Sequence, residues 1–310
     1  MKITRFMPML LTGILFITLA SSCKKDDDPI QVSNTITDKV VADANLSLLE
    51  KAVIKAGLDG TLKGTGPFTV FAPDDAAFNA AGITSSVIDA LPASALSEIL
   101  LYHTLGSKVL AADVPAGPNA KVITASGDSV FVTKNANGVF VNGVKVTTAD
   151  IIADNGVIHK IGRVLLPPTG NIVETATDAG LDSLVKAATI AGLGSTLSTA
   201  TLTVFAPSNQ AFTDLLNALG LNDINEIPLS TLTAVLTYHV VGGRAFSSDL
   251  SNGSLTMFAG GATTVNLTNG TGGGPTILGA SNGTNKSNIT ATDIVCTNGV
   301  VHLIDRVLLP

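Results

Sequence analysis

The stretch FTVFAPDDAAF at residues 68–78 returns as LTVFAPSNQAF at residues 202–212, with seven of the eleven positions identical. After the shared proline, one copy has Asp74 where the other has Ser208. A catalytic carboxylate could not become a serine and keep its role, whereas Asp and Ser are both good helix N-caps. The stretch therefore predicts a short strand, a corner and a capped helix. Four phenylalanines are expected in the core: Phe71, Phe78, Phe205 and Phe212.

Three further blocks repeat in the same order. They are ANLSLLEKAVIKAGL and AGLDSLVKAATIAGL at 44–58 and 179–193, LLYH and LTYH at 100–103 and 236–239, and NGVIHKIGRVLLPP and NGVVHLIDRVLLP at 155–168 and 298–310. Equivalent residues lie between 134 (205 − 71) and 143 (298 − 155) positions apart. A unit of that length can hold its own hydrophobic core. The sequence therefore predicts two domains in tandem.

The second unit carries an insertion. The offset between copies grows from 136 at the Tyr-His block to 143 at the Asn-Gly block, so seven residues are added around residues 266–287. This stretch is rich in glycine, but no helix pattern follows it and no Lys-Ser/Thr pair closes it, as a phosphate-binding loop would require. We expect a long β-hairpin loop instead.

Local patterns predict the elements of each unit. Leu46 and Leu49 keep helical spacing, and Gly57 ends that helix. The Tyr-His blocks predict helices that run into a strand, the Asn-Gly-Val blocks a turn and a strand, and RVLLP a final strand. Asn-Gly pairs at 137–138 and 142–143 predict hairpin turns. Because helices precede strands in each unit, the expected class is α+β with mostly antiparallel sheets.

Composition limits the possible functions. Hydrophobic residues make up 45% of the chain and charged residues 14%, which is too apolar for a disordered protein. The net charge is −6, and no Lys/Arg stripe with interleaved aromatics is present, so we predict no nucleic-acid partner. Trp is absent and there are two Tyr, which limits the usual stacking platforms for sugars.

The N-terminus has the pattern of a bacterial lipoprotein leader. Lys2 and Arg5 precede an apolar run at residues 6–20, which is shorter than the roughly 20 residues of a membrane span. The small residues ASSC then end at Cys23, as in a lipobox. We predict cleavage before Cys23 and lipidation of its thiol; the alternative is an ordinary secretory signal with an incidental cysteine.

The charged run that follows Cys23 sets the expected location. KKDDDP at residues 24–29 predicts a solvated linker. It also resembles the signal by which some Gram-negative bacteria send lipoproteins to the cell surface. The expected location is therefore the outer membrane of a Gram-negative bacterium, lipid-anchored and exposed at the surface. The N-terminal lipid would be the only membrane contact.

The blocks TVFAP…AF, YH and NGV(I/V)H…RVLLP resemble the fasciclin-like (FAS1) domain family, in the family's order and in both halves. The resemblance implies a β-sandwich or wedge with helices packed on it. It also implies a role in adhesion and extracellular partners. The expected division is a signal peptide at 1–22, a linker at 23–35, and fasciclin-like domains at 36–168 and 169–310. In animal members the Tyr-His region has been implicated in partner binding, which carried over gives Tyr102, His103, Tyr238 and His239.

The recurring ionisable residues favour structural roles. Each unit offers two histidines and no cysteine pair, whereas a zinc site takes three or four ligands. No GxSxG nucleophile is present. We expect the histidines to be hydrogen-bonded core residues; they are His103, His159, His239 and His302.

The repeat also predicts structural roles for two aspartates and one cysteine. Asp150 and Asp293 recur in TADI and ATDI and are expected as exposed turn caps; metal binding would need further oxygen ligands close by. Cys296 aligns with Ala153, so we expect an inert, buried thiol.

These observations lead to a functional hypothesis in which the protein has no catalytic residue, bound metal or cofactor. The chain is expected to be a non-catalytic surface lipoprotein that adheres to an extracellular protein or matrix partner. The alternative is an accessory glycan-binding lipoprotein of an outer-membrane uptake system. An enzyme is not expected, because no nucleophile, cofactor or metal signature stands out.

Overall fold

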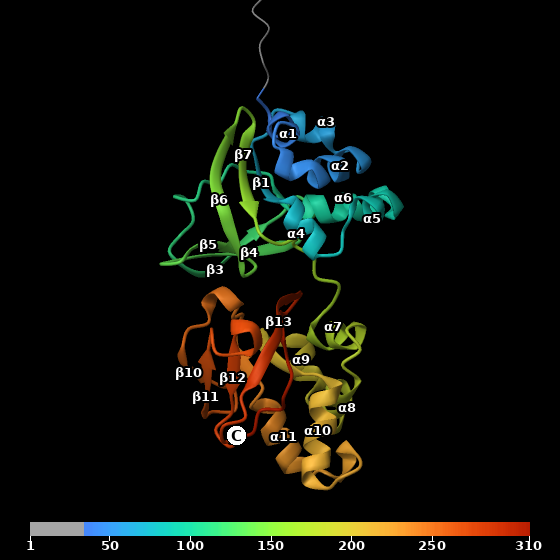
Figure 1. Cartoon of the computed structure of the whole chain (residues 1–310), viewed down its shortest axis with the longest axis vertical. Helices are drawn as coiled ribbons and strands as arrows, with labels where there is room; N and C mark the ends of the chain where they lie inside the picture. The colour runs from blue at the N-terminus through green and yellow to red at the C-terminus, as the bar shows by residue number, and fades with distance from the viewer. Residues whose placement is uncertain (1–33) are drawn as a thin grey trace, which may run out of the picture. The chain divides into compact units, whose positions relative to one another are not determined.

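The computed structural model describes residues 34–310, which form one compact unit. The predicted signal peptide, Cys23 and most of the predicted linker lie outside the described residues. No helix of residues 34–310 is both long and apolar enough to cross a membrane. Within each half of this unit the helices gather on one side and the strands on the other (Figure 1).

The first domain begins with helices and ends with a sheet. Its helices are α1 (Ile36–Val41), α2 (Ser47–Lys55), α3 (Asp59–Lys63), α4 (Asp75–Ala80), α5 (Ser85–Ala90) and α6 (Ala93–Tyr102), with a 3-10 turn at Ala44–Leu46. Its strands are β1 (Phe68–Pro73), β2 (Thr104–Leu105), β3 (Gly117–Ile123), β4 (Ser129–Asn135), β5 (Gly138–Val141), β6 (Val144–Ala153) and β7 (Gly156–Ile161).

These strands form one seven-stranded sheet in the order β2-β1-β7-β6-β5-β4-β3. Only β1 and β7 pair in parallel, so the expectation of a mostly antiparallel sheet is confirmed. The hairpin turn before β6 is formed by Asn142 and Gly143, both with positive φ, as the Asn-Gly pair predicts. The register of β6 shifts twice around Asp150, whose φ is 58°. Such bulges bend a strand and redirect its side chains.

The second domain repeats this plan. Its helices are α7 (Ile172–Asp178), α8 (Asp182–Ile190), α9 (Gly194–Thr199), α10 (Asn209–Leu219) and α11 (Leu229–Thr237), with 3-10 turns at Ile224–Glu226, Ser247–Asp249 and Thr271–Gly273. Its strands are β8 (Leu202–Pro207), β9 (Val240–Gly242), β10 (Gly253–Thr256), β11 (Ala262–Asn266), β12 (Thr276–Leu278), β13 (Ser287–Cys296) and β14 (Gly299–Ile304). The sheet order is β10-β11-β12-β13-β14-β8-β9, and the α+β class is confirmed for both domains.

The seven-residue insertion is more structured than predicted. Residues 266–287 are not one hairpin loop, because they contain β12, which pairs with both β11 and β13. Asn288 fixes the loop before β12 by accepting from the Thr271 amide at 2.9 Å, and its own amide group donates to Asp305. The loop after β12 holds the C-terminal segment through Asn282, which bonds the backbone of Val307 and Leu309.

The repeated stretch at residues 68–78 and 202–212 forms a strand, a corner and a capped helix in both domains. The Asp74 carboxylate accepts from the Ala77 amide at 2.8 Å, and the Ser208 hydroxyl accepts from the Ala211 amide at 3.2 Å. The exchange of Asp for Ser is therefore explained by N-capping, as predicted. The four phenylalanines that were expected in the core are all buried, at 4% exposure or less.

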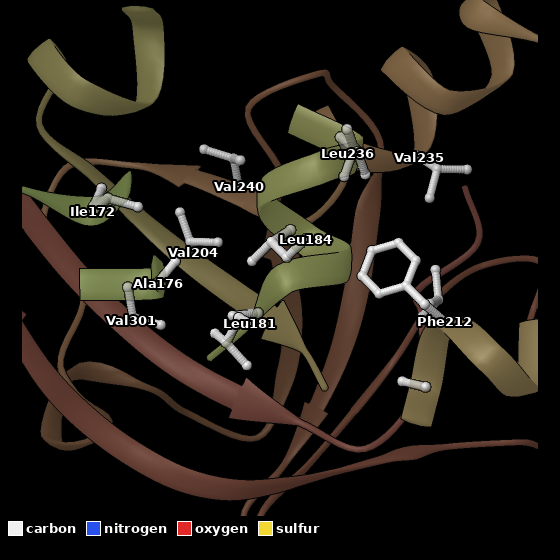
Figure 2. Close-up of a cluster of buried hydrophobic side chains, with 14 of the residues drawn as sticks. Ile172, Ala176, Leu181, Leu184, Val204, Phe212, Val235, Leu236, Val240 and Val301 are labelled. Atoms are coloured by element: carbon white, nitrogen blue, oxygen red, sulfur yellow. The ribbon is translucent and has the colours of Figure 1, made fainter. Parts of the chain in front are cut away.

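The helices bury apolar faces against the sheet of their own domain. In the first domain Leu46, Leu49 and Val53 join the core as their spacing predicts, and Gly57 with φ of 70° follows the helix. Figure 2 shows the corresponding cluster of the second domain, where α7, α8, α10 and α11 contribute side chains around Leu184 and Phe212. Each fully buried Leu or Phe side chain contributes roughly 1.5–3 kcal/mol.

One predicted element is absent. The RVLLP segments at 163–167 and 306–310 were expected as strands, but neither is paired in a sheet. The apolar pattern of these segments resembles that of a strand. It reflects burial without strand pairing, because Val164, Leu165, Val307 and Leu308 are all buried. The segments are held instead by side chains of the Tyr-His blocks.

Candidate functional site

The first histidine of each domain joins the end of a helix to the RVLLP segment. The His103 ring accepts from the Leu165 amide through Nε2 at 2.9 Å, and its Nδ1–H donates to the Ile99 carbonyl at 2.8 Å. In the second domain His239 makes the same two bonds. These contacts require a neutral ring with the proton on Nδ1.

Burial keeps both rings neutral. His103 and His239 are 2% and 1% exposed. Loss of solvation lowers the pKa of each imidazole from 6.5 to about 4, although the hydrogen bond to the Ile99 or Val235 carbonyl opposes this shift. Neither ring has a nitrogen left for a metal ion or a substrate, so these histidines serve the fold.

The tyrosine beside each histidine is also an interior residue. The Tyr102 hydroxyl donates to the Ser129 carbonyl at 3.1 Å and accepts from the Asn142 amide group at 2.9 Å. Burial raises the pKa of Tyr102 to about 12, with the Asn142 hydrogen bond acting in the opposite direction. The Tyr238 hydroxyl likewise donates to the Ala262 carbonyl at 2.6 Å.

The predicted partner-binding residues are therefore not at the surface. Tyr102, His103, Tyr238 and His239 are each 2% exposed or less. An approaching protein would not touch them in this structure. We do not place a partner site on them, and their recurrence follows from the hydrogen bonds that they make inside each domain.

The second histidine of each domain supports the bulge in the long strand. His159 donates from Nε2 to the Val109 carbonyl at 2.8 Å, and its Nδ1 accepts from the Asp150 amide at 3.2 Å. His302 repeats this geometry with Ala245 and Asp293. Desolvation lowers the pKa of His302. Each ring also packs against a core phenylalanine.

The aspartate at the bulge differs between the domains. The Asp150 side chain is 40% exposed, and its Oδ1 accepts from the Ala111 amide at 2.9 Å. The Asp293 side chain is only 1% exposed, so the expectation of an exposed turn cap is wrong at this position. Its burial has a specific cause, which is a contact with the first domain.

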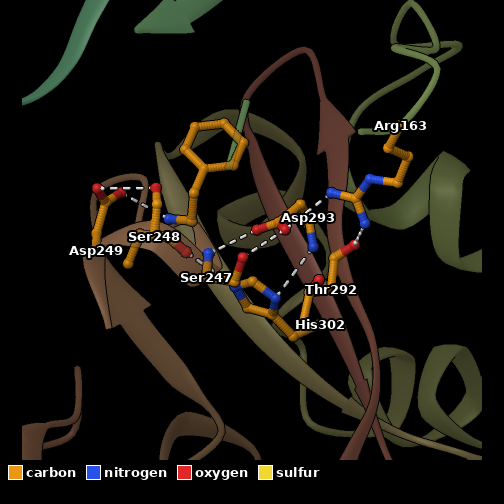
Figure 3. Close-up of polar contacts among 9 residues, drawn as sticks. Arg163, Ser247, Ser248, Asp249, Thr292, Asp293 and His302 are labelled. Atoms are coloured by element: carbon orange, nitrogen blue, oxygen red, sulfur yellow. Dashed lines mark hydrogen bonds and ion pairs between the residues drawn. The ribbon is translucent and has the colours of Figure 1, made fainter. Parts of the chain in front are cut away.

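Asp293 binds one cation and two groups of a neighbouring turn (Figure 3). Arg163, from the first domain, donates from Nη2 to Oδ2 at 2.9 Å. The Ser247 amide and hydroxyl each donate to the carboxylate at 2.6 Å. The ion pair and the hydrogen bonds offset the desolvation cost of burying this carboxylate.

Further contacts join the same two surfaces. The Arg244 guanidinium lies 4.4 Å from the centre of the Phe131 ring and donates to the carbonyls of Cys296, Thr297 and Gly299. Phe131 also packs with Phe246 and Val300 in a small apolar cluster. Side chains of β3 and β4 add polar bonds, from Asn119 to Arg244 and from Thr133 to Asp249.

Sequence reasoning missed this contact. Arg163 and Arg306 occupy the same position of the repeated RVLLP block, so the repeat alone gives them the same role. The available signal was a difference between copies: Arg244 and Phe246 stand where the first domain has Lys108 and Leu110. Substitutions of this kind in an otherwise repeated block mark a surface that only one copy uses.

A metal ion in a protein requires several ligands that lie close together. No three His, Cys, Asp or Glu side chains of these residues lie together as metal ligands would. Cys296 is buried as predicted, and desolvation raises the pKa of its thiol. Such a thiol is a poor nucleophile.

The sequence of this chain is similar to those of known proteins that contain fasciclin domains. The Fasciclin domain model matches the chain twice, over residues 44–167 and 179–310. Protein sll1483 of Synechocystis sp. is 38% identical over 136 residues, which cover 43% of this chain and 74% of that protein.

Two animal proteins are also similar. The transforming growth factor-beta-induced protein ig-h3 of Sus scrofa is 37% identical over 134 residues, 43% of this chain and 19% of that protein. Human periostin is 29% identical over 257 residues, 80% of this chain and 29% of that protein. The chain thus spans less than a third of either animal protein.

A solved structure, a FAS1 domain pair from the insect cell adhesion molecule fasciclin I, matches with a TM-score of 0.42 and 19% identity, covering 88% of this chain and 96% of that one. Because the family model covers most of the sequence in two separate matches, the chain belongs to the fasciclin family and carries two fasciclin domains in tandem.

Proposed function

We propose that this protein is a non-catalytic, surface-anchored adhesion module that binds an extracellular protein or matrix component. Fasciclin domains occur in proteins of cell adhesion and of the extracellular matrix, and this chain has two. The observation that carries the proposal is the use of the recurring polar residues. Both nitrogens of all four histidines bond to backbone within the same domain, which leaves them no role in catalysis.

Anchoring through Cys23 is part of the proposal. The basic residues, the short apolar run and ASSC support cleavage and lipidation at this position. Two or more acyl chains give stable attachment, since each buried CH2 contributes about 0.8 kcal/mol. Mass spectrometry of the native protein tests this step. We expect a lipid-modified N-terminal Cys23, and an unmodified N-terminus beyond this residue would contradict it.

The surface around Asp150 is our choice for the partner site. The equivalent surface of the second domain binds Arg163 and Thr133 of the first domain through Asp293 and Asp249. In the first domain the same construction is present, with the Ala111 amide bonded to Asp150 at 2.9 Å, but the Asp150 side chain stays 40% exposed. Charge complementarity favours a partner that presents arginine or lysine there.

Attachment of cells tests the function. A strain without the gene should attach to surfaces and to neighbouring cells less than its parent, and the intact gene should restore attachment. The Asp150→Ala variant should restore less than the Asp178→Ala variant, which changes an exposed aspartate in the other domain. If the strain without the gene attaches like its parent, the adhesion proposal is wrong. Tight binding of an oligosaccharide on an array would favour the glycan-binding alternative.

A further inference from the structure

The first domain contains an apolar cavity of about 200 Å³. Its walls come from the inner faces of β1, β3, β4, β5 and β6, including Phe71, Val122, Val132, Val139 and Val146. The irregular segment between β2 and β3 covers one side. Protein interiors are close-packed and have few voids larger than a water molecule, so a native cavity of this size calls for an explanation.

The buried polar side chain of this cavity is already hydrogen-bonded, and the other ionisable side chain is exposed. His159 and Asp113 are the ionisable residues of the lining. Both ring nitrogens of His159 bond to backbone, to Val109 at 2.8 Å and to Asp150 at 3.2 Å. Asp113 is exposed and accepts from the Leu110 amide at 3.0 Å. A polar group placed against His159 and the apolar walls, away from Asp113, would therefore lose its hydration without gaining a partner.

The covering segment is held in place without a ligand. The Ala111 amide donates to Asp150 at 2.9 Å, and the Ala111 carbonyl accepts from the Lys134 ammonium at 3.0 Å. The Val109 amide donates to the Thr69 hydroxyl at 2.9 Å. These bonds tie the segment to β1, β4 and β6, so the cavity is preformed and a ligand need not order it.

We propose that this cavity is a binding site for a compact apolar molecule, the size of a single aromatic ring or a short branched hydrocarbon. A dry cavity of about 150 Å³ lined by Leu, Ile and Phe is known to bind benzene or xenon. The cavity described here is larger, valine supplies six of its thirteen lining residues, and both ring nitrogens of its buried histidine, His159, are already bonded. This inference does not rest on the adhesion proposal.

The second domain supplies the substitutions for a test. Tyr102 and Tyr238 bond to Ser129 and Ala262, which sets the register of the two domains. In that register Val122 corresponds to Leu255. Val146 corresponds to Ile289, because Val146 pairs with Ile161 in the first domain as Ile289 pairs with Ile304 in the second. The side chain is one methylene larger in the second domain at both positions, although Val241 and Ala245 are smaller there than Leu105 and Val109.

The experiment uses the chain from position 23 with Cys23→Ser, which keeps residues 34–310 and avoids detergent. Benzene is titrated while methyl resonances are followed by NMR. We expect saturable shifts at Val122, Val132, Val139 and Val146. Phenol should bind at least tenfold more weakly than benzene, because its hydroxyl would be buried without a partner.

A filled cavity is the decisive variant. Val122→Leu combined with Val146→Ile should weaken benzene binding at least tenfold, measured by the shifts of Val132 and Val139, whereas the matched change in the second domain, Leu255→Val with Ile289→Val, should leave the shifts of these two first-domain valines unchanged. Should the filled variant not fold, the wild-type shifts decide alone. Shifts that do not saturate, that lie outside the cavity lining, or that persist in a folded filled variant would overturn the proposal.

Discussion

The two fasciclin domains make the same internal bonds but present different surfaces. Each has a buried Tyr-His pair and a second histidine under a strand bulge, with matching partners and distances. At the bulge itself Asp150 is exposed, while Asp293 is buried against Arg163. The comparison therefore distinguishes two kinds of recurring residue. Some recur because every copy of the domain needs them to fold. Others recur in sequence, but their environment differs between the two copies.

Acid should destabilise both domains through the shared histidines. The pKa of His103 and of His239 is about 4 in the folded chain and 6.5 when solvated. The unfolded chain therefore binds more protons between these values, so stability is full above pH 6.5 and falls as the pH drops toward 4. From pH 7 to pH 5 we expect a loss of about 2 kcal/mol for each histidine.

Urea unfolding at several pH values measures this loss. His302, whose pKa is also lowered by burial, acts in the same direction. Carboxylates such as Asp43, whose pKa is held low by Lys160, lose their charge only at more acidic pH and so do not interfere. A free energy of unfolding that stays constant between pH 7 and 5 would show that these rings are not buried and neutral.

Removing either Tyr-His histidine should damage its domain to a similar degree. His103→Ala leaves the Leu165 amide without its partner, and His239→Ala does the same to the Leu308 amide, while the Ile99 and Val235 carbonyls keep backbone partners. The unpaired buried amide costs about 1–3 kcal/mol in each variant, and the cavity left by the ring adds to this loss of stability. Urea unfolding at pH 7.5 gives the value, and variants that unfold like the parent would refute the structural role.

Substitution of the two aspartates at the bulge should cost different amounts of stability. This difference tests whether the contact between the domains stabilises only the second copy of the bulge. Asp293→Ala removes the acceptor for Arg163 and Ser247, and we expect a loss of roughly 2–3 kcal/mol, below the full cost of a broken buried pair because Arg163 is half-exposed. Asp150→Ala should cost within about 1 kcal/mol, since water can replace the carboxylate at Ala111. Equal losses would mean that the contact between the domains contributes little.

The smallest effect is expected at an ion pair that both domains share. Lys51 pairs with Asp89 at 2.6 Å, and Lys186, at the equivalent position, pairs with Asp223 at 2.8 Å. All four side chains are more than a third exposed, so solvent screens both pairs. Lys51→Met and Lys186→Met should leave the urea midpoint almost unchanged. A clear shift in only one domain would reveal a contact that the repeat conceals.

Prediction from sequence succeeded where chemistry was repeated. The exchange of Asp74 for Ser208 identified a helix cap, and histidines among aliphatic neighbours identified core hydrogen bonds. It failed where the partner lies far along the chain. Nothing local indicates that Arg163 meets Asp293, 130 residues away, or that the apolar RVLLP segments lack a neighbouring strand and are held by a histidine.

The most direct test of this account is the protonation state of the four histidines, measured by nitrogen-15 NMR of the ring atoms from pH 8 to pH 4. The hydrogen bonds predict the Nδ1–H tautomer for His103 and His239 and the Nε2–H tautomer for His159 and His302. His103 and His239 should remain neutral until about pH 4. A His103 or His239 ring that titrates near pH 6.5, or carries its proton on Nε2, would contradict the claim that these residues hold the fold together.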